Sequence, residues 1–323
     1  DLLDGLADAG LAPSDLDQIL LTHWHPDHSG LAGDLQERSG APVRVHEVDA
    51  PLVAGEEEAT AELLELRERC FEEWGIPAKK RAELDGVKAD FTDIAGKPGD
   101  TRSFSGGDQI PAGDGELSVW HLPGHAAGHV AFAFETDDVS VAIDADGTGS
   151  AGDATEAGSA DVAADATDAA DATSRSEAFV GDVILPEYTP NVGGADLRVD
   201  RPLRQYVDSL DRLIDRDFDR AWPGHRDPID DPAERARVIR AHHVDRTHRV
   251  VETLREHGPA DAWTVSAHLF GELEDIHILH GPGEAFAHLD HLQHAGAVER
   301  EGREYRLVDP NPDVSALFSK TKY

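Results

Sequence analysis

The chain has 323 residues and carries 65 Asp and Glu against 29 Lys and Arg, a formal net charge of −36. This charge excludes a protein that grips nucleic acid through a general basic field, and no apolar run approaches the roughly 18 residues that span a bilayer. Cys70 is the only cysteine, which excludes an internal disulfide and a zinc site made of cysteines alone. We therefore expect a soluble, cytoplasmic protein without membrane contact.

The charged residues are unevenly chosen, with 40 Asp and 25 Glu against 23 Arg and 6 Lys. Such a surface repels itself in dilute buffer, and salt relieves the repulsion. The composition is typical of proteins from a salty cytoplasm, so we predict a halophilic protein. Because the chain contains no methionine, we also expect that its natural start was removed or that the sequence is a fragment.

The first two-thirds of the chain alternate helix and strand signals. An Ile-Leu-Leu-Thr run predicts a buried strand, Gly and Asp pairs separate short apolar segments, and leucines three and four apart predict amphipathic helices. The predicted elements are a leucine-rich helix at the start, a strand at 19–22, a helix over about 56–74, strands at 116–122, 129–135 and 139–143, and a helix over about 200–216.

Residues 145–178 are almost entirely Ala, Asp, Gly, Ser and Thr. A segment of this composition buries too little apolar surface to offset the entropy of ordering it. We predict a disordered acidic insertion between two strands of the core, with an acidic docking segment as the alternative.

The end of the chain predicts a second, smaller unit. A long helix runs from Pro232 to about His257, short helices follow near 264–270 and 282–295, and two strand-like pieces lie at 297–300 and 304–308. Helices followed by a hairpin indicate a winged-helix module, but 282–295 contains no Lys or Arg for DNA. We expect this helix to pack against the main domain or another subunit, as in a homodimer. The predicted division is 1–230, 231–310 and a tail at 311–323.

The strongest chemical signal is the run His23-Trp24-His25-Pro26-Asp27-His28, directly after the first predicted strand. Residues two apart on an extended segment share a face, so His23 and His25 can aim at one point. The chain then turns, and Asp27 and His28 can aim at a neighbouring point. Imidazole suits zinc and a carboxylate adds charge for a second divalent ion, so the run predicts a metal site.

Three further candidates each follow a glycine. His125 and His225 both stand in a Pro-Gly-His sequence, and Asp182 follows Gly181 at the end of an apolar run. A glycine allows tight backbone geometry at a strand end. Each of these sequences alone is typical of a turn, but together with the first run they indicate additional metal ligands.

These motifs resemble the metallo-β-lactamase superfamily of hydrolases, in its glyoxalase II-like and LACTB2-like branch, over about residues 10–310. The resemblance rests on the His-x-His-x-Asp-His run, a Pro-Gly-His-x-x-Gly-His run at 123–129, the Gly-Asp pair and the second Pro-Gly-His. It extends to 201–210 and to a His-His-x-x-Arg sequence at 242–246, before the winged-helix-like tail.

The resemblance implies a mixed α/β (α+β) fold, an αββα sandwich that holds two metal ions, usually zinc, at one edge. Members of the family begin with strands that this chain lacks, so we expect the N-terminal strands of the sandwich to be missing. His129 is expected beside the ligands rather than among them. By the same likeness the first Zn²⁺ is bound by His23, His25 and His125, the second by Asp27, His28 and His225, and Asp182 bridges the two.

The implied activity is hydrolysis of a small-molecule ester or thioester by a hydroxide that bridges the two ions. Asp27 is the predicted catalytic residue, which orients this nucleophile and takes its proton. The alternative is a metal-dependent endoribonuclease of the LACTB2-like type, which needs cations near the cleft; Arg198, Arg201 and Arg204 are the only nearby cluster. A third possibility, suggested by the missing strands, is a non-catalytic scaffold.

The remaining candidates have plainer interpretations. His288, His291 and His294 share part of a helix face, but no carboxylate or cysteine pattern supports a third metal site. We expect Cys70 to be an ordinary packed thiol. His242, His243 and Arg246 are expected to anchor their helix to the domain, and Tyr188 and Asn191 to line the substrate entrance.

Overall fold

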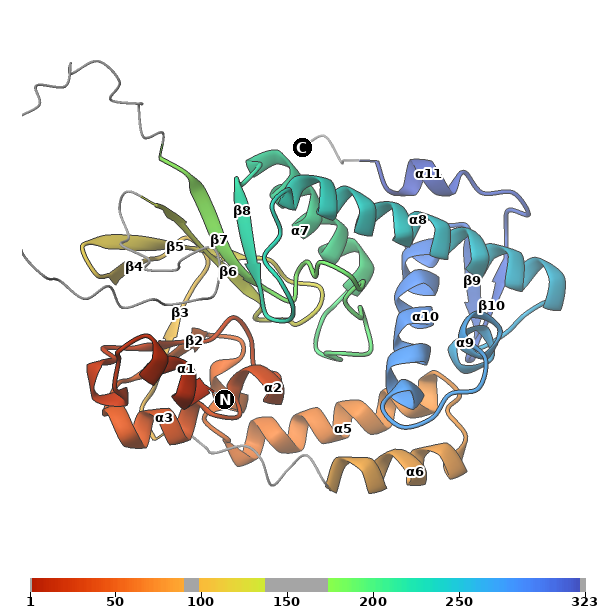
Figure 1. Cartoon of the computed structure of the whole chain (residues 1–323). Helices are drawn as coiled ribbons and strands as arrows, with labels where there is room; N and C mark the ends of the chain where they lie inside the picture. Colours follow the sequence, from red (N-terminus) through yellow and green to blue (C-terminus); the bar gives the residue numbers. More distant parts are fainter. Residues whose placement is uncertain (1, 90–98, 137–173, 320–323) are drawn as a thin grey trace, which may run out of the picture.

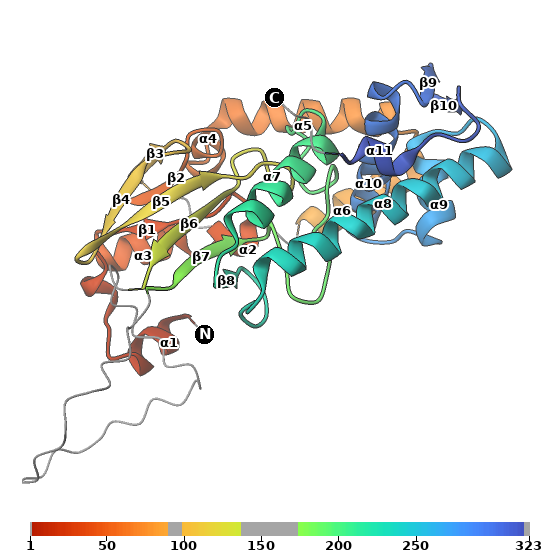
Figure 2. The same ribbon diagram turned by 90° about the horizontal axis from the view of Figure 1, so that it is seen from above.

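The computed structural model describes residues 2–89, 99–136 and 174–319 (Figure 1). Two β-sheets lie face to face between helices, and a largely helical region, from residue 232 onward, extends to one side (Figure 2). We call residues 232–319 the C-terminal region. Among the described helices, none combines the length and the apolar character that crossing a membrane requires.

The first sheet has the order β1-β2-β3, and all of its described strands run parallel. The second has the order β4-β5-β6-β7-β8, in which the first four strands are antiparallel and β8 runs parallel to β7. The strand bounds are β1 Ile19–Leu20, β2 Val43–His46, β3 Thr101–Phe104, β4 Gln109–Ala112, β5 Gly115–His121, β6 Val130–Glu135, β7 Ser176–Gly181 and β8 Arg220–Pro223.

Strand β6 shows how the sequence builds the layers. Its run Val-Ala-Phe-Ala-Phe is buried on both faces, and successive side chains point to opposite sides of a sheet. Val130, Phe132 and Phe134 pack with the aromatic and aliphatic residues between the two sheets. Ala131 and Ala133 face the other way, toward the helices. The small residues let helices approach closely, and the large ones fill the space between the sheets.

Helices cover both outer faces. On the first sheet, α3 (Ala32–Ser39) packs Leu35 against Val43 and Val45. On the second sheet lies α7 (Pro202–Arg216), whose buried side includes Leu203, Tyr206 and Leu210. The arrangement is therefore the predicted αββα sandwich. The remaining elements of this part are α1 Leu2–Asp8, a 3₁₀ helix at Pro13–Asp15, α2 Pro26–Ser29, α4 Ala50–Val53, α5 Glu57–Glu73 and α6 Ala78–Ala89.

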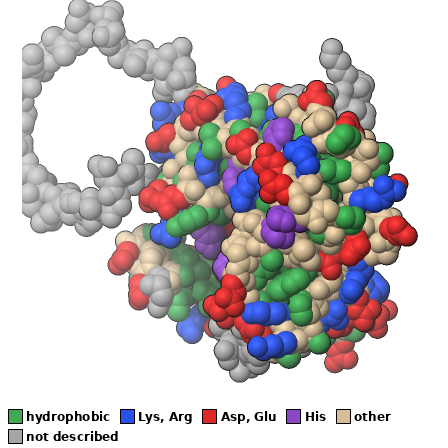
Figure 3. Space-filling model, turned by 90° about the vertical axis from the view of Figure 1, so that its right-hand side faces the viewer, with side chains coloured by type: hydrophobic (Ala, Val, Ile, Leu, Met, Phe, Trp, Pro, Cys, Tyr) green, Lys and Arg blue, Asp and Glu red, His purple; other side chains and the backbone are tan. Residues whose placement is uncertain are grey.

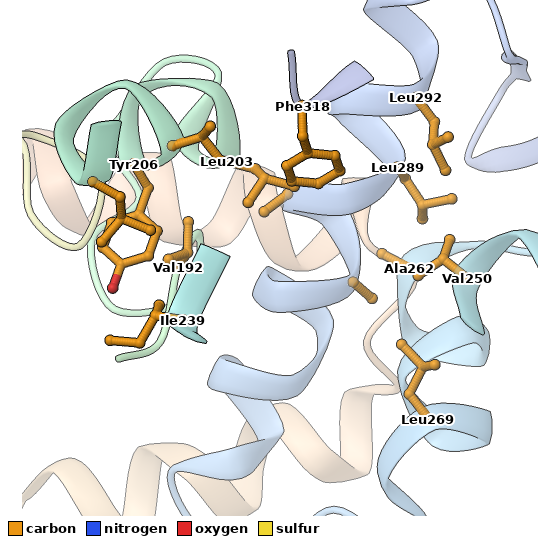
Figure 4. Packing of buried hydrophobic residues seen from close by; sticks show 14 of the residues in the cluster. Val192, Leu203, Tyr206, Ile239, Val250, Ala262, Leu269, Leu289, Leu292 and Phe318 are labelled. Atoms are coloured by element: carbon orange, nitrogen blue, oxygen red, sulfur yellow. The ribbon is translucent and has the colours of Figure 1, made fainter. Parts of the chain in front are cut away.

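The C-terminal region shares one continuous apolar core with α7, so it is not a separate appendage. Figure 4 shows Leu203 and Tyr206 of α7 in the same cluster as Leu289 and Leu292 of the C-terminal region. Helices followed by a hairpin are found as predicted, while their winged-helix interpretation stays a prediction. The bounds are α8 Pro232–His257, α9 Ala262–Phe270, α10 His277–His294, β9 Val298–Glu301, β10 Glu304–Leu307 and α11 Val314–Leu317.

Two predicted boundaries were wrong. Residues 176–178 belong to β7 rather than to the acidic insertion, because Ala178 is buried in the core and paired with β6. Helix α10 begins at His277 rather than at 282. It continues through Gly281-Pro282-Gly283, although this sequence is typical of a break in a helix. The predicted strand at 139–143 and the remainder of the insertion up to residue 173 lie outside the described residues.

The first testable prediction concerns α7. Leu203 is fully buried between the second sheet and the C-terminal region, so Leu203→Ala should lower the free energy of unfolding by about 3 kcal/mol through lost burial and a residual cavity. Urea unfolding at fixed high salt measures this value. The matched control is Val238→Ala on α8, where the side chain is 47% exposed and a change within about 0.5 kcal/mol is expected. Equal losses in the two variants would contradict the packing described.

Candidate metal centre

The predicted ligands come from four segments that meet at one edge of the sandwich. His23, His25, Asp27 and His28 follow β1, and His125 lies in the connection between β5 and β6. Strands β7 and β8 run parallel, so their carboxyl ends lie together and bring Asp182 and His225 to the same edge. The main chain joins the first two segments, because the Val130 N–H donates to the Thr22 carbonyl at 2.8 Å.

His23, His25 and His125 form a first cluster, with one nitrogen of each ring within 4.8 Å of the others. Main-chain carbonyls fix which nitrogens carry protons. His125 donates from Nδ1 to the Asn191 carbonyl at 2.9 Å, and His25 donates from Nε2 to the Ala195 carbonyl at 3.0 Å. The other two nitrogens, His125 Nε2 and His25 Nδ1, then carry lone pairs that face each other at 3.2 Å. A cation held by these two nitrogens would stabilise this arrangement.

Asp27, His28 and His225 form a second cluster, also within 4.8 Å. His225 Nε2 lies 3.2 Å from Asp27 Oδ2, and His28 Nε2 lies 3.6 Å from the same oxygen. Asp182 stands between the clusters: its carboxylate is 3.4 Å from His28 and 3.5 Å from His225, but also 3.8 Å from His125. The structure thus brings all seven predicted ligands together, with Asp182 at the position of a bridge.

The protonation states suit a metal site. Burial lowers the pKa of His25 to about 3, and His125 acts in the same direction. Burial and neighbouring imidazoles also hold the pKa of His23 well below its ordinary value. Burial alone would raise the pKa of Asp182, but His28 and His125 reverse the effect and hold it below the usual range. Burial opposes protonation of His28, but the Asp182 and Asp27 carboxylates raise its pKa above the ordinary value. At neutral pH the first cluster therefore presents neutral imidazoles beside an ionised Asp182, and these are the forms that bind metal.

Three buried ligand atoms have no hydrogen-bond partner within the described part of the chain: His23 Nε2, His28 Nε2 and Asp182 Oδ1. Buried polar atoms are almost always paired, since an unpaired one costs about 1–3 kcal/mol. His23 and His28 each belong to one cluster and Asp182 lies between the two, and nitrogen and carboxylate oxygen are the donors that zinc and similar divalent ions take. These residues fit a pair of metal ions.

Glycine is required at two points of the centre. A Cβ on Gly224 would lie 2.4 Å from His28 Cε1 and 2.6 Å from Asp182 Oδ1, so no side chain fits between these ligands. Gly181 has φ +48°, and a Cβ there would lie 2.7 Å from Thr22 Oγ1. The glycines that precede Asp182 and His225 are therefore a steric condition for bringing the ligands together.

His129 lies beside the ligands and in neither cluster. Its buried ring accepts a hydrogen bond at Nε2 from the Asp182 main-chain N–H at 3.0 Å, which helps to hold Asp182 between the two clusters. Tyr188, in the segment after Asp182, is 57% exposed, and the Arg226 guanidinium lies 5.7 Å from the centre of its ring. Asn191 contacts His125 through its carbonyl.

A buried ion network behind the first cluster was missed by the sequence analysis. Arg198 donates to Asp49 at 2.7 Å and to Asp196 at 2.6 Å. The two carboxylates in turn accept from the main-chain N–H of Trp24 at 3.1 Å and from that of Ala127 at 2.9 Å. The network ties together the segments that carry His25 and His125. Asp196 and Arg198 are two residues apart, but Asp49 lies 149 residues from Arg198, and the three share no motif that would mark them as a network.

Comparison with known proteins agrees with this architecture. Residues 1–225 match the metallo-beta-lactamase superfamily. The chain is similar to a metallo-beta-lactamase family protein from Thermus thermophilus, with 29% identity, a TM-score of 0.68 and coverage of 95% of this chain and 84% of that one. It also shares its fold with a beta-lactamase domain protein from Burkholderia ambifaria, with 24% identity, a TM-score of 0.66 and coverage of 94% and 79%.

The geometry of the second cluster generates a prediction. Gly224→Ala places a methyl group against His28 and Asp182, so it should weaken zinc binding by about tenfold, the effect of displacing groups that orient a ligand. A chelator-competition titration measures the affinity. Gly5→Ala, where nothing lies within 4 Å of an added Cβ, is the control and should bind as the unchanged protein does. Full affinity in Gly224→Ala would contradict the close approach of the ligands.

Proposed function

This chain belongs to the metallo-β-lactamase superfamily, and on that basis we propose that it hydrolyses a small ester or thioester with two zinc ions. Members of the superfamily are generally metal-dependent hydrolases, and this chain has a matching sandwich with His and Asp clusters. The observation that supports two ions is the placement of Asp182, whose carboxylate lies within 4 Å of members of both clusters.

The residues divide the work between them. Two bound divalent ions would lower the pKa of water and polarise the scissile carbonyl. His23, His25 and His125 would hold one ion, Asp27, His28 and His225 the other, and Asp182 both. Asp27 is 58% exposed, so its carboxylate can accept a proton from water beside the ligands and release it to solvent. Cys70 takes no part, because burial raises the pKa of its thiol to about 11.

The structure weighs against the endoribonuclease alternative. Nuclease activity needs cations that hold a polyanion in register. Of the three candidate arginines, Arg198 is bound between two buried carboxylates and Arg204 pairs with Asp208 at 2.6 Å. The face seen in Figure 3 shows Lys and Arg side chains dispersed among acidic ones. The observations favour a small substrate over RNA.

Metal stoichiometry tests the two-ion proposal. The unchanged protein should bind about two zinc ions, and Asp182→Ala should weaken both, because its carboxylate is shared. The measurement is zinc content by elemental analysis after equilibration at several free zinc concentrations. Asp114→Ala, an exposed carboxylate in the turn between β4 and β5, is the control with unchanged content. A single ion that is insensitive to Asp182→Ala would contradict the proposal.

Substrate class is tested by assaying thioesters, small esters and RNA side by side, in high salt with zinc. We expect thioester turnover that His25→Ala reduces by at least about 100-fold, since a ligand to the reacting centre is lost, with little or no RNA cleavage. Arg201→Ala, which removes one of the arginines that the alternative requires, should leave thioester turnover unchanged. Strong metal-dependent RNA cleavage without thioester turnover would reverse the ranking.

A further inference from the structure

One loop orients both histidines whose tautomers define the first cluster. The Asn191 carbonyl accepts from His125 and the Ala195 carbonyl accepts from His25. We call residues 191–196 the orienting loop. Because a carbonyl can only accept, the position of this loop decides which nitrogen of each ring keeps its lone pair for a metal ion. Displacing the loop would turn both rings.

The orienting loop is held from outside the sandwich, by α10 of the C-terminal region. The Asn191 side chain donates from Nδ2 to Glu284 Oε2 at 3.1 Å and to the His280 carbonyl at 3.1 Å. The Val192 N–H donates to the same Glu284 oxygen at 3.2 Å. Glu284 is buried, so water does not replace these bonds. Figures 1 and 2 both show the loop before α7 lying beside α10.

Backbone packing supports the same contact. A Cβ on Gly283 would lie 2.3 Å from Gly194 Cα, and a Cβ on Gly194 would lie 2.6 Å from His280 Cα. The orienting loop and α10 therefore touch main chain to main chain, which only glycine permits. This contact gives a physical reason for the Gly-Pro-Gly sequence inside α10.

Glu284 is also part of a cluster with His243 and His288 that has the composition of a metal site. Its surroundings argue against that role. Arg246 donates to Glu284 Oε1 at 3.2 Å, and a fixed cation there opposes a second one. His288 Nδ1 lies 2.7 Å from Thr247 Oγ1, and His243 Nδ1 lies 3.3 Å from His288 Nε2. These ring nitrogens therefore form hydrogen bonds with protein groups. The carboxylate is occupied as an acceptor from several sides.

We propose that Glu284 is a positioning residue for the first metal ion, acting through Asn191 and the orienting loop on His125 and His25. The C-terminal region is then part of the metal centre, although it supplies no ligand. The inference rests on the proposed two-ion site and adds that the two ions depend unequally on α10: the second cluster has no contact with the orienting loop among the bonds of the described residues.

The test separates the two ions with ligand variants. His225→Ala leaves the first cluster intact and His25→Ala leaves the second, and zinc affinity is measured by chelator competition in each. Adding Glu284→Ala should weaken binding about tenfold in the His225→Ala protein and by less than about twofold in the His25→Ala protein. Glu284→Gln, which keeps an acceptor for Asn191, should restore most of the affinity. Co²⁺ absorption spectra should change in the same order.

Matched controls keep the result interpretable. Glu274→Gln, an exposed carboxylate just before α10, should change nothing. If Glu284→Ala does not fold, Gly283→Ala is the substitute: its methyl group would press on Gly194 and should lower zinc affinity in the same way. Gly281→Ala is its control, because the added Cβ would meet the Leu273 and Phe270 side chains, and zinc affinity should not change. The inference would be overturned if Glu284→Ala left zinc affinity unchanged, or if it lowered the affinity equally in the His225→Ala and His25→Ala proteins. In either case, two ions in the unchanged protein would still support the proposed two-ion site. Absence of metal from the unchanged protein would overturn both proposals.

Discussion

The centre depends on one constraint: ligand atoms that repel one another or lack partners are held together in a buried place. The lone pairs of His25 and His125 face each other at 3.2 Å, and buried atoms of His23, His28 and Asp182 have no hydrogen-bond partner in the described chain. Without a cation this arrangement costs free energy. The stability of the surrounding sandwich, with a core that continues into the C-terminal region, maintains it.

The parts of this centre that sequence could predict are those in which chemistry and chain position coincide. The run from His23 to His28 and the Gly-Asp and Gly-His pairs placed all seven candidates where the strands end. The glycine before His225 was expected to allow tight backbone geometry, and a side chain at Gly224 would indeed collide with His28 and Asp182. The order of helices and hairpin in the C-terminal region was predicted from the sequence, although α10 begins earlier than expected, and the sandwich was predicted from the resemblance. Local pattern was sufficient for the candidate ligands because each of them stands in a short motif at the end of a predicted strand.

What the sequence could not show are contacts made across long separations. Arg198 reaches Asp49 over 149 residues, and Glu284 reaches Asn191 over 93; neither pair belongs to a motif. The same contacts explain where prediction was wrong. Helix α10 continues through Pro282 because its neighbouring glycines gain close packing against the orienting loop and Leu273, so tertiary contact outweighs a local breaker. Arg198 looked like a free cation because Asp49 is distant in the sequence, and an acidic neighbour such as Asp196 does not by itself indicate an ion pair.

The placement of arginines in an acidic chain bears on the kind of substrate. The chain has 29 basic residues against 65 acidic ones, and two arginines near the centre are bound to buried carboxylates. Arg198 forms ion pairs in the network behind the first cluster, and Arg246 forms one with Glu284 on α10. These arginines neutralise buried carboxylates that position the ligand loops, and burial makes such pairs costly to break. The charges of Arg198 and Arg246 thus serve to build the centre and are not available for holding a polyanion.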